Sequence, residues 1–346
     1  MDLEMLRARA AIIQNVRRFF DERAYLELDT PVLAPDLIPE SCLEVFKTTL
    51  LPALNSRKQT ARDYWLVPSP EIWMKKLIAE HRTDVYQICK CFRNCESSGF
   101  AHSPEFTMLE YYTMDADYTD SLDITENLFD ALAAGSGAKT LEPPFLRWTM
   151  DQAFSRLAGF SLTETLENGT LSREARRLGL EPPDGSSDGD IYNLVFIHAV
   201  EPCLPKEKPL ALVDYPAAVP CLAKLNTGNG AAMADGCPAP MTRQRWELYV
   251  HGIELANCFS EETDAEEVRK FFLSEQEEKT RRAAVPHAVD GDYWKTFLPR
   301  KTAGGAMLSF PRCSGVALGL DRLIMALTGR STIDAVLPFP MEPLLP

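Results

Sequence analysis

Residues 91–112 read CFRNCESSGFAHSPEFTMLEYY, and this stretch carries the most informative pattern in the chain. Residues 84–93 and 105–112 are rich in Val, Ile, Tyr and Phe, which favours β-strands. The segment between them, 94–104, is polar and has the composition of a loop. The pattern therefore predicts an antiparallel hairpin with a long connecting loop, and it places Arg93 where the first strand ends.

The segments before this hairpin have helical and strand periodicity. Residues 69–80 begin with Ser69 and Pro70, which predict an N-cap and a first helical residue, and continue with helix formers. Apolar residues recur at helical spacing over 5–20, and the alternating YLELDTPVL that follows predicts a strand ending in prolines. A helix, a strand and a second helix are thus expected before the hairpin.

The remainder of the chain mixes the same two patterns. Residues 118–200 are mostly helical in pattern, interrupted by the loop-forming PPDGSSDGD. Strand signals return from Trp246, a charged helix is expected over 264–283, and GVALGLDRLIMALTG predicts a strand that runs into a helix. We therefore expect an α+β fold, an antiparallel sheet flanked by helices, as a single domain over 1–346 with a mainly helical insertion at about 118–205.

Charge and hydropathy exclude several classes of protein. The formal net charge of −14 argues against a broad nucleic-acid-binding surface, because a phosphate backbone is gripped mainly by clustered Lys and Arg. The N-terminus lacks the apolar core and cleavage site of a signal peptide, and no apolar run approaches the roughly 20 residues that a membrane-spanning helix needs. A large tRNA footprint is therefore disfavoured, and a cytoplasmic location is expected.

The nine cysteines are an odd number scattered along the chain, which favours reduced thiols over a disulfide framework. Cys89, Cys91 and Cys95 come closest to a cluster. Their spacing is not that of a paired zinc motif, and they lie in an apolar strand-like run, so buried structural thiols are expected.

Residues 245–261 read RWELYVHGIELANCFSE and contain the best candidate for a metal site. If the His-Gly dipeptide forms a two-residue turn, Tyr249 pairs with Glu254, and Glu247 lies diagonally on the same sheet face. Two converging carboxylates suit Mg²⁺, which prefers oxygen ligands and bridges phosphate oxygens. The alternative is a pair of solvent-facing glutamates.

Strict alternation along this second strand would place Asn257, Phe259 and Glu261 on the face opposite Glu254. If all four line one pocket, the strand needs an extra residue. The sequence therefore predicts a β-bulge directly after Glu254.

Three segments together resemble class II aminoacyl-tRNA synthetases. Residues 91–112 resemble motif 2 of that family, GVALGLDRL at 315–323 resembles motif 3, and FFDERAYLELDTPVLAP at 19–35 resembles motif 1. Motif 1 builds the dimer interface in the family, so the resemblance implies a homodimer. Each motif alone is weak, since an arginine in a hairpin or a GxxxGxxR pattern occurs often by chance, but their order makes the match specific.

The resemblance implies an ATP site. The arginine that matches Arg93 contacts the amino-acid carboxylate and the ATP α-phosphate, and the one that matches Arg322 packs on the nucleotide. Gly315 and Gly319 leave room where the backbone approaches the nucleotide. The full set implied to contact ATP and its Mg²⁺ is Arg93, Asn94, Glu96, His102, Ser103, Glu247, Leu248, Gly319 and Arg322, with Glu247 and Glu254 as metal ligands.

Within class II, the segments SPE (69–71), EFTMLEYY (105–112) and GIELANCFSE (252–261) resemble the lysyl branch. An acidic pocket opposite Arg93 suits a substrate with two ammonium groups and one carboxylate. The resemblance assigns Glu71 and Glu110 to the α-amino end of the substrate, and Tyr112 and Glu261 to the side-chain ammonium. The complete expected substrate-binding set is Ser69, Pro70, Glu71, Glu110, Tyr112, Glu254, Asn257, Phe259, Glu261 and Ala317.

The match is closest to the lysyl-tRNA synthetase paralogues that attach (R)-β-lysine to a lysine of elongation factor P, over residues 7–330 and including KEKP at 206–209. The motifs begin almost at the N-terminus, so no anticodon-binding domain is expected. Ala317 stands where lysyl-tRNA synthetases have glycine, and the added methyl would reshape the pocket floor, for which the shifted amino group of β-lysine would be a reason. Two alternatives are a truncated lysyl-tRNA synthetase that charges tRNA and a catalytically silent paralogue that binds ATP or lysine.

The chain also departs from the family pattern. One extra residue, Cys95, lies between Arg93 and the histidine of the loop, and Glu96 takes the place of the usual glutamate. Ser103 replaces an asparagine that contacts ATP, and Cys258 replaces a glycine. Altered affinity is expected more than lost activity. The implied reaction is attack of the substrate carboxylate on the ATP α-phosphate, followed by transfer of the acyl group to an amine.

Overall fold

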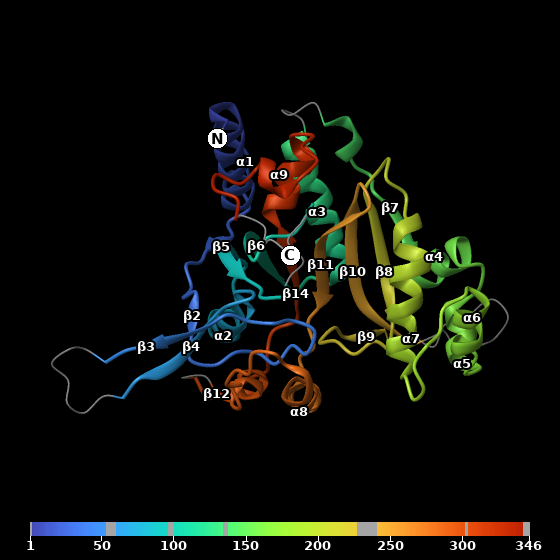
Figure 1. Cartoon of the computed structure of the whole chain (residues 1–346). Coiled ribbons are helices and arrows are strands. Elements are labelled where there is room, and N and C mark those ends of the chain that lie inside the picture. Colours follow the sequence, from blue (N-terminus) through green and yellow to red (C-terminus); the bar gives the residue numbers. More distant parts are fainter. Residues whose placement is uncertain are drawn as a thin grey trace. The chain divides into compact units, whose positions relative to one another are not determined.

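The computed structural model describes residues 2–52, 60–95, 100–133, 138–226, 241–301 and 304–341 (Figure 1). The chain divides into two compact units, which are described separately. Unit 1 comprises Met1–Asp115, Glu262–Cys313 and Ala317–Pro346, and unit 2 comprises Ala116–Glu261 and Ser314–Val316. The expected single domain with an insertion stays a prediction.

The first helix of unit 1, α1 (Leu3–Asp21), confirms the predicted N-terminal helix. Its N-cap Asp2 accepts a hydrogen bond from the Glu4 backbone N–H at 3.0 Å. The buried Phe20 ring stacks on Tyr86 with ring centroids 4.8 Å apart. The predicted strand after α1 is reduced to the two-residue strands β1 (Leu26–Glu27) and β2 (Leu33–Ala34), because Pro31 lies between them and cannot donate to a strand ladder.

The predicted hairpin is confirmed. Strand β5 (Val85–Phe92) pairs antiparallel with β6 (Glu105–Met114), from Val85 opposite Tyr112 to Phe92 opposite Glu105. On its other edge β5 pairs in parallel with β1.

Helix α2 (Glu71–His81) is also confirmed, but its start was predicted wrongly: the N-cap is Pro70, not Ser69, and no side chain caps it. Arg82 ends the helix in the left-handed conformation, at φ 50°. Glu71 is therefore the first helical residue, where a carboxylate is favoured by the helix dipole.

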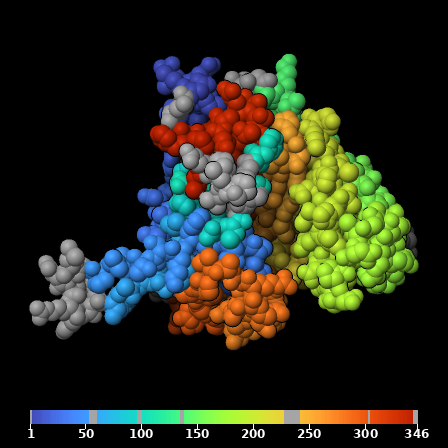
Figure 2. Space-filling view, viewed as in Figure 1, coloured from blue at the N-terminus to red at the C-terminus, as the bar shows by residue number. Residues whose placement is uncertain are grey.

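Two further groups of elements complete unit 1. Strands β2, β4 (Arg62–Leu66) and β3 (Lys47–Leu50) form a small antiparallel sheet, and β3 and β4 project as an arm from the rest of the unit (Figure 2). The charged helix α8 (Ala265–Arg282) begins at N-cap Asp264, as predicted within a residue. The remaining short elements are η4 (Tyr293–Phe297), β12 (Arg300–Lys301), β13 (Met307–Leu308) and η5 (Ile333–Ala335).

Strand β14 (Cys313–Gly319) runs into helix α9 (Leu320–Leu327), which confirms the predicted strand-to-helix transition. The helix has a fully buried face that includes Leu320, Leu323 and Ile324. This periodic burial fixes which side of α9 packs inward, and so where its polar residues lie.

Unit 2 is mostly helical between residues 118 and 200, as predicted, with helices packed around a core that includes Phe154, Tyr192 and Leu212. One strand, β7 (Leu146–Thr149), was missed because four residues are too few for a clear period. The helices are α3 (Tyr118–Ala133), η1 (Lys139–Leu141), α4 (Met150–Leu157), α5 (Leu162–Glu167), α6 (Leu171–Arg177), α7 (Asp188–Val195), η2 (Phe196–Val200) and η3 (Glu201–Cys203).

The strands of unit 2 follow the order β11 (Ile253–Ser260), β10 (Thr242–Val250), β8 (Leu210–Pro216) and β7, with β9 (Leu225–Asn226) paired to β10. β10 is antiparallel to both of its long neighbours, whereas β7 and β8 run parallel. Across the described parts of the chain, none of the helices is both long and apolar enough to cross a membrane.

Candidate active site

One face of the β5–β6 hairpin in unit 1 carries the expected substrate residues. Because side chains alternate along a strand, Gln87, Cys89 and Cys91 share a face, and Glu110 lies directly opposite Gln87. Arg93 follows at the end of this face, where its backbone N–H donates to Pro104 O at 3.0 Å. Hairpin geometry therefore brings a guanidinium and a carboxyl group to the same side of the sheet.

The environment of the Glu110 carboxyl group suits a cationic ligand. It is 3 % exposed, and the Tyr112 hydroxyl donates to its Oε1 at 2.7 Å. Its Oε2 is buried with no hydrogen-bond partner among the residues that the structure describes. Burial, and then the negative charge of Glu71, raise the pKa of Glu110 well above its usual value. A bound ammonium group would satisfy the free oxygen and favour the carboxylate.

Lys75 is a buried cation that the sequence reasoning missed. Its side chain is 1 % exposed, and its Nζ lies 2.5 Å from Glu71 Oε1. Its charge also lowers the pKa of Glu110, against the larger effect of burial. Glu71 and Lys75 are four residues apart on one helix, so their spacing was the signal that could have revealed the pair. The pair holds the Glu71 carboxylate in place at the start of α2.

Arg93 is placed by the residues around it. Its guanidinium lies 5.2 Å from the centroid of the Phe106 ring, and its Nε is buried with no partner among the described residues. The next residue, Asn94, donates its backbone N–H to Glu44 O at 2.8 Å and its side-chain amide to Val45 O at 3.3 Å. These bonds tie the end of β5 to the segment around Glu44.

Of the predictions for the loop after Arg93, one is wrong and the others are not tested. Cys95 is exposed and has φ 55°, so the expectation that it is buried was wrong. Its backbone N–H bonds to the Asn94 side chain, which turns it outward from the strand. Glu96 lies outside the described residues. His102 is exposed, and nothing tests its predicted contact with ATP.

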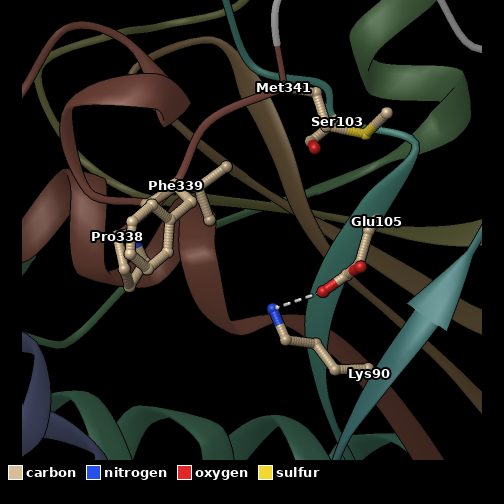
Figure 3. Close-up of a pocket in the computed structure, with 7 residues that line it drawn as sticks. Lys90, Ser103, Glu105, Pro338, Phe339 and Met341 are labelled. Carbon is tan, nitrogen blue, oxygen red and sulfur yellow. Dashed lines mark ion pairs between the residues drawn. The ribbon is translucent and has the colours of Figure 1, made fainter.

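Ser103 lines a cavity of about 250 Å³ together with Lys90, Glu105, residues 337–339 and Met341 (Figure 3). Lys90 and Glu105 form an ion pair at 3.2 Å across the cavity wall. Lys90 alternates with Cys89 and Cys91, so this cavity lies on the side of β5 opposite the face that carries Glu110. The predicted contact of Ser103 with ATP stays a prediction.

Arg322 extends from the first turn of α9, and its Nε donates to Ala101 O at 3.0 Å. Gly319 is the N-cap of this helix, and Ala317 shares its partly exposed face of β14, as alternation requires. Because Arg93 is bonded to Pro104, both arginines are anchored to the loop that connects β5 and β6. Unit 1 thus contains Arg93, Arg322, Glu71, Glu110 and Tyr112, with Ser69 and Pro70 directly before α2.

The predicted β-bulge in unit 2 is confirmed. Tyr249 pairs with Glu254, whereas Leu248 pairs with Ala256, so Leu255 is the extra residue on β11. The turn between the strands is the predicted His-Gly pair, with φ 53° at His251 and 78° at Gly252.

The bulge returns Glu254 to the face of its neighbours on β11. Asn257 pairs with Glu247, and Phe259 pairs with Arg245. Glu254, Asn257 and Phe259 are partly exposed, while the residues between them are buried. Glu261, after the end of β11, is 3 % exposed and bridges Ala223 through the backbone. Leu248, expected near ATP, has a fully buried side chain that alternates with Glu247 and so points to the other face.

Glu247 is held from both sides. Arg245 forms an ion pair with its Oε1, and the Tyr249 hydroxyl donates to its Oε2 at 2.8 Å. Arg245 Nε also donates to Asn257 Oδ1 at 3.3 Å. Burial alone would lower the pKa of Arg245. The negative charge of Glu247 outweighs this effect, so the pKa lies above its usual value. Arg245 is therefore a fixed cation beside the expected metal ligand.

The residues of unit 2 fit Mg²⁺ in ligand type. Glu247 and Glu254 supply oxygen ligands from one sheet face. No group of three or more acidic, histidine or cysteine ligands occurs within the described parts of the chain. Mg²⁺ commonly keeps several waters and is bound by one or two carboxylates plus substrate phosphates, so two glutamates suit this ion. A bound ion would share Glu247 with Arg245. The two sets of site residues lie in different units, so their convergence on one cleft stays a prediction.

The family model for class II tRNA synthetases of the D, K and N type matches residues 2–343. The chain belongs to this family. Three curated relatives named elongation factor P–(R)-beta-lysine ligase are similar over 340 residues, which are 98 % of this chain and 96 % of each relative. They come from Avibacterium paragallinarum (32 % identical), Vibrio atlanticus strain LGP32 (34 %) and Pasteurella multocida strain Pm70 (30 %).

The match confirms the predicted α+β class II catalytic fold. Sequence reasoning missed several charged residues that lie beside the assigned ones. Arg9 pairs with Asp321, the neighbour of Arg322, and Glu40 interacts electrostatically with Glu71 and Arg93. Lys75 pairs with Glu71, and Arg245 pairs with Glu247. Of these, Asp321 lies within the quoted GLDR segment, and Arg245 lies within RWEL, so both could have been found as charges beside an assigned residue. Arg9 and Glu40 had no such signal, because their partners come from distant segments.

Glu40 predicts a pH dependence of folding stability. Burial, and then the charge of Glu71, raise the pKa of Glu40 to about 7, against lowering by Arg93. The folded-state pKa of Glu40 exceeds the unfolded value of 4.5. The folded protein therefore has its full stability below pH 4.5, and its free energy of unfolding falls as the pH rises from there through 7. Glu40→Gln has no proton to lose. Between pH 5 and 8, we expect the free energy of unfolding of the wild type to fall by about 2 kcal/mol relative to that of Glu40→Gln. Urea unfolding of both proteins measures the difference. Parallel pH profiles for the two proteins would refute this.

Proposed function

We propose that this chain uses ATP and Mg²⁺ to convert lysine or (R)-β-lysine into its adenylate and then transfers the acyl group to a lysine side chain of elongation factor P. The observation that carries the proposal is the buried Glu110 on the same hairpin face as Arg93, with one carboxyl oxygen that has no hydrogen-bond partner among the described residues. Relatives that match 98 % of the chain are named as ligases of this kind. The net charge of −14 supports a protein acceptor over tRNA.

Each group has a defined role in the proposed reaction. Arg93 binds the substrate carboxylate and the α-phosphate, and so holds the attacking oxygen and the phosphorus in line. Arg322 orients the nucleotide. Glu247 and Glu254 would hold Mg²⁺, which would supply positive charge to the phosphates of bound ATP. The acceptor amine then attacks the acyl carbon, forms an amide and releases AMP.

The substrate ammonium groups are assigned to two places. Glu71 and Glu110 receive the amino group nearer the carboxylate, while Tyr112 and Glu261 receive the side-chain ammonium. We further propose a cytoplasmic homodimer with its interface at residues 19–35. Sedimentation as a monomer at working concentration would contradict the dimer.

Glu110→Gln is expected to raise the KM for lysine about 30- to 160-fold, because a charged hydrogen bond contributes roughly 2–3 kcal/mol. The pKa of Glu110 is raised, and only the ionised carboxylate pairs with an ammonium group, so the wild-type KM falls as the pH rises through that pKa. The variant loses this dependence. The matched control is Glu105→Gln on the same strand, which is exposed and faces the other side.

Pyrophosphate exchange measured with α-lysine and with (R)-β-lysine tests activation, and the preferred isomer follows from the ratio of the two rates. Elongation factor P and tRNA are then offered as acceptors in separate reactions. Amide formation on elongation factor P supports the proposal. Charging of tRNA alone would favour a truncated lysyl-tRNA synthetase, and no exchange with either isomer would favour a silent ATP- or lysine-binding paralogue.

A further inference from the structure

Two thiols meet on the expected substrate face of unit 1. The Sγ atoms of Cys89 and Cys91 are 3.7 Å apart on β5. Lys90 between them extends to the other side of the strand, toward Glu105 (Figure 3). Both cysteines therefore point toward the face that holds Glu110, and neither has a role in the proposed reaction.

The surroundings of the pair are rich in soft and apolar groups. Met108 lies directly opposite Cys89 on β6, and Phe106 lies opposite Cys91. Cys91 is fully buried, whereas Cys89 is partly exposed and gives access to the pair. The contact with Cys89, and then burial, raise the pKa of Cys91 well above its usual value, so Cys91 rests as a neutral thiol.

The strand geometry disfavours a direct disulfide. Residues two apart in an extended strand have Cα atoms about 6.6 Å apart, near the upper limit of about 6.8 Å for a disulfide, and their parallel side chains keep the Cβ atoms farther apart than a disulfide's usual 3.5–4.5 Å. A single bridging atom meets no such limit. With bonds of about 2.3 Å to each sulfur at a tetrahedral angle, it spans about 3.8 Å, which agrees with the observed 3.7 Å.

We propose that Cys89 and Cys91 form a bidentate site for a thiophilic metalloid or soft metal centre, with trivalent arsenic as its probe. With phenylarsine oxide, two As–S bonds form and the As–O bond breaks, and the oxygen leaves as water with the two thiol protons. No oxidant or reductant is needed. The second half of the proposal, which rests on the proposed function, is that an occupied dithiol excludes the amino-acid substrate from the Glu110 face.

The site is tested by titrating the whole protein with phenylarsine oxide, using native mass spectrometry and a count of free thiols. One arsenic bound with the loss of two thiols is expected, reversed by a dithiol but not by a monothiol at the same concentration. Cys91→Ser and Cys89→Ser should each bind at least about 100-fold more weakly, because the second thiol reacts intramolecularly. Cys95→Ser, an exposed cysteine of the same hairpin, is the matched control. Unchanged affinity in Cys91→Ser would overturn the site.

Lysine binding to the arsenic-loaded protein, followed by calorimetry, tests the second half. Loss of lysine binding in the wild type, with retention in Cys91→Ser exposed to the same reagent, is the expected result. Equal lysine binding before and after loading would overturn the exclusion of substrate. The arsenic stoichiometry requires neither ATP nor lysine, so a failure of pyrophosphate exchange would count against the proposed function and leave the dithiol result intact.

Discussion

Arg93→Lys is expected to lower kcat/KM for adenylate formation about 10²- to 10³-fold while leaving the protein folded. Lysine keeps the positive charge but lacks the planar fork that can bind a carboxylate and a phosphate oxygen together. The hydrogen bond from the Arg93 backbone to Pro104 does not involve the side chain, so the hairpin should persist. Pyrophosphate exchange with lysine measures the effect, and circular dichroism confirms folding.

The control for this variant is Arg62→Lys, an exposed arginine on the β4 arm of the same unit, which should retain activity within about twofold. Full activity in Arg93→Lys would remove Arg93 from the phosphate-binding role. An effect confined to the KM for lysine would leave it with the substrate carboxylate only, because removing an interaction of equal strength in the ground and transition states does not change kcat.

Asp321→Asn is expected to destabilise the fold by about 3–5 kcal/mol, because it leaves a buried guanidinium without its counter-charge. Arg9 Nη2 lies 2.6 Å from Asp321 Oδ1, and both side chains are at most 10 % exposed. Asp321 also accepts the Thr107 backbone N–H at 2.6 Å, and Arg9 donates to the Thr107 hydroxyl at 3.0 Å. The triad joins α1, β6 and α9, which are distant in sequence. Urea unfolding measures the loss.

The matched control is Asp63→Asn, whose partner Lys47 lies 2.8 Å away in an ion pair that is nearly half exposed on each side. Water screens that pair, so a change below about 0.5 kcal/mol is expected. If Asp321→Asn lowered the free energy of unfolding by a similarly small amount, the Arg9 guanidinium would have to be neutralised by another group. Because Arg322 follows Asp321 in the first turn of α9, the variant should also weaken nucleotide binding.

Much of the local structure was predictable because its causes are local. The β5–β6 hairpin, α1, α8 and the β14–α9 junction follow from apolar periodicity over lengths long enough to resolve a period. The bulge at Leu255 was predicted from a functional requirement, since strict alternation would have separated Glu254 from Asn257. The N-cap of α2 and the exposure of Cys95 were predicted wrongly, and the strands β3, β4, β7 and β8 were not predicted.

The sequence by itself determined the fold class, the hairpin, the turn at His251 and the types of group that the site offers, because these depend on neighbours along the chain and on motifs of the class II family. Only the tertiary structure decided which charges are neutralised and which are left for a ligand. Arg245 pairs with Glu247, Arg9 pairs with Asp321, and Glu110 Oε2 has no hydrogen-bond partner among the residues that the structure describes. Burial removes water as the alternative partner, and only the packed chain fixes which side chain replaces it.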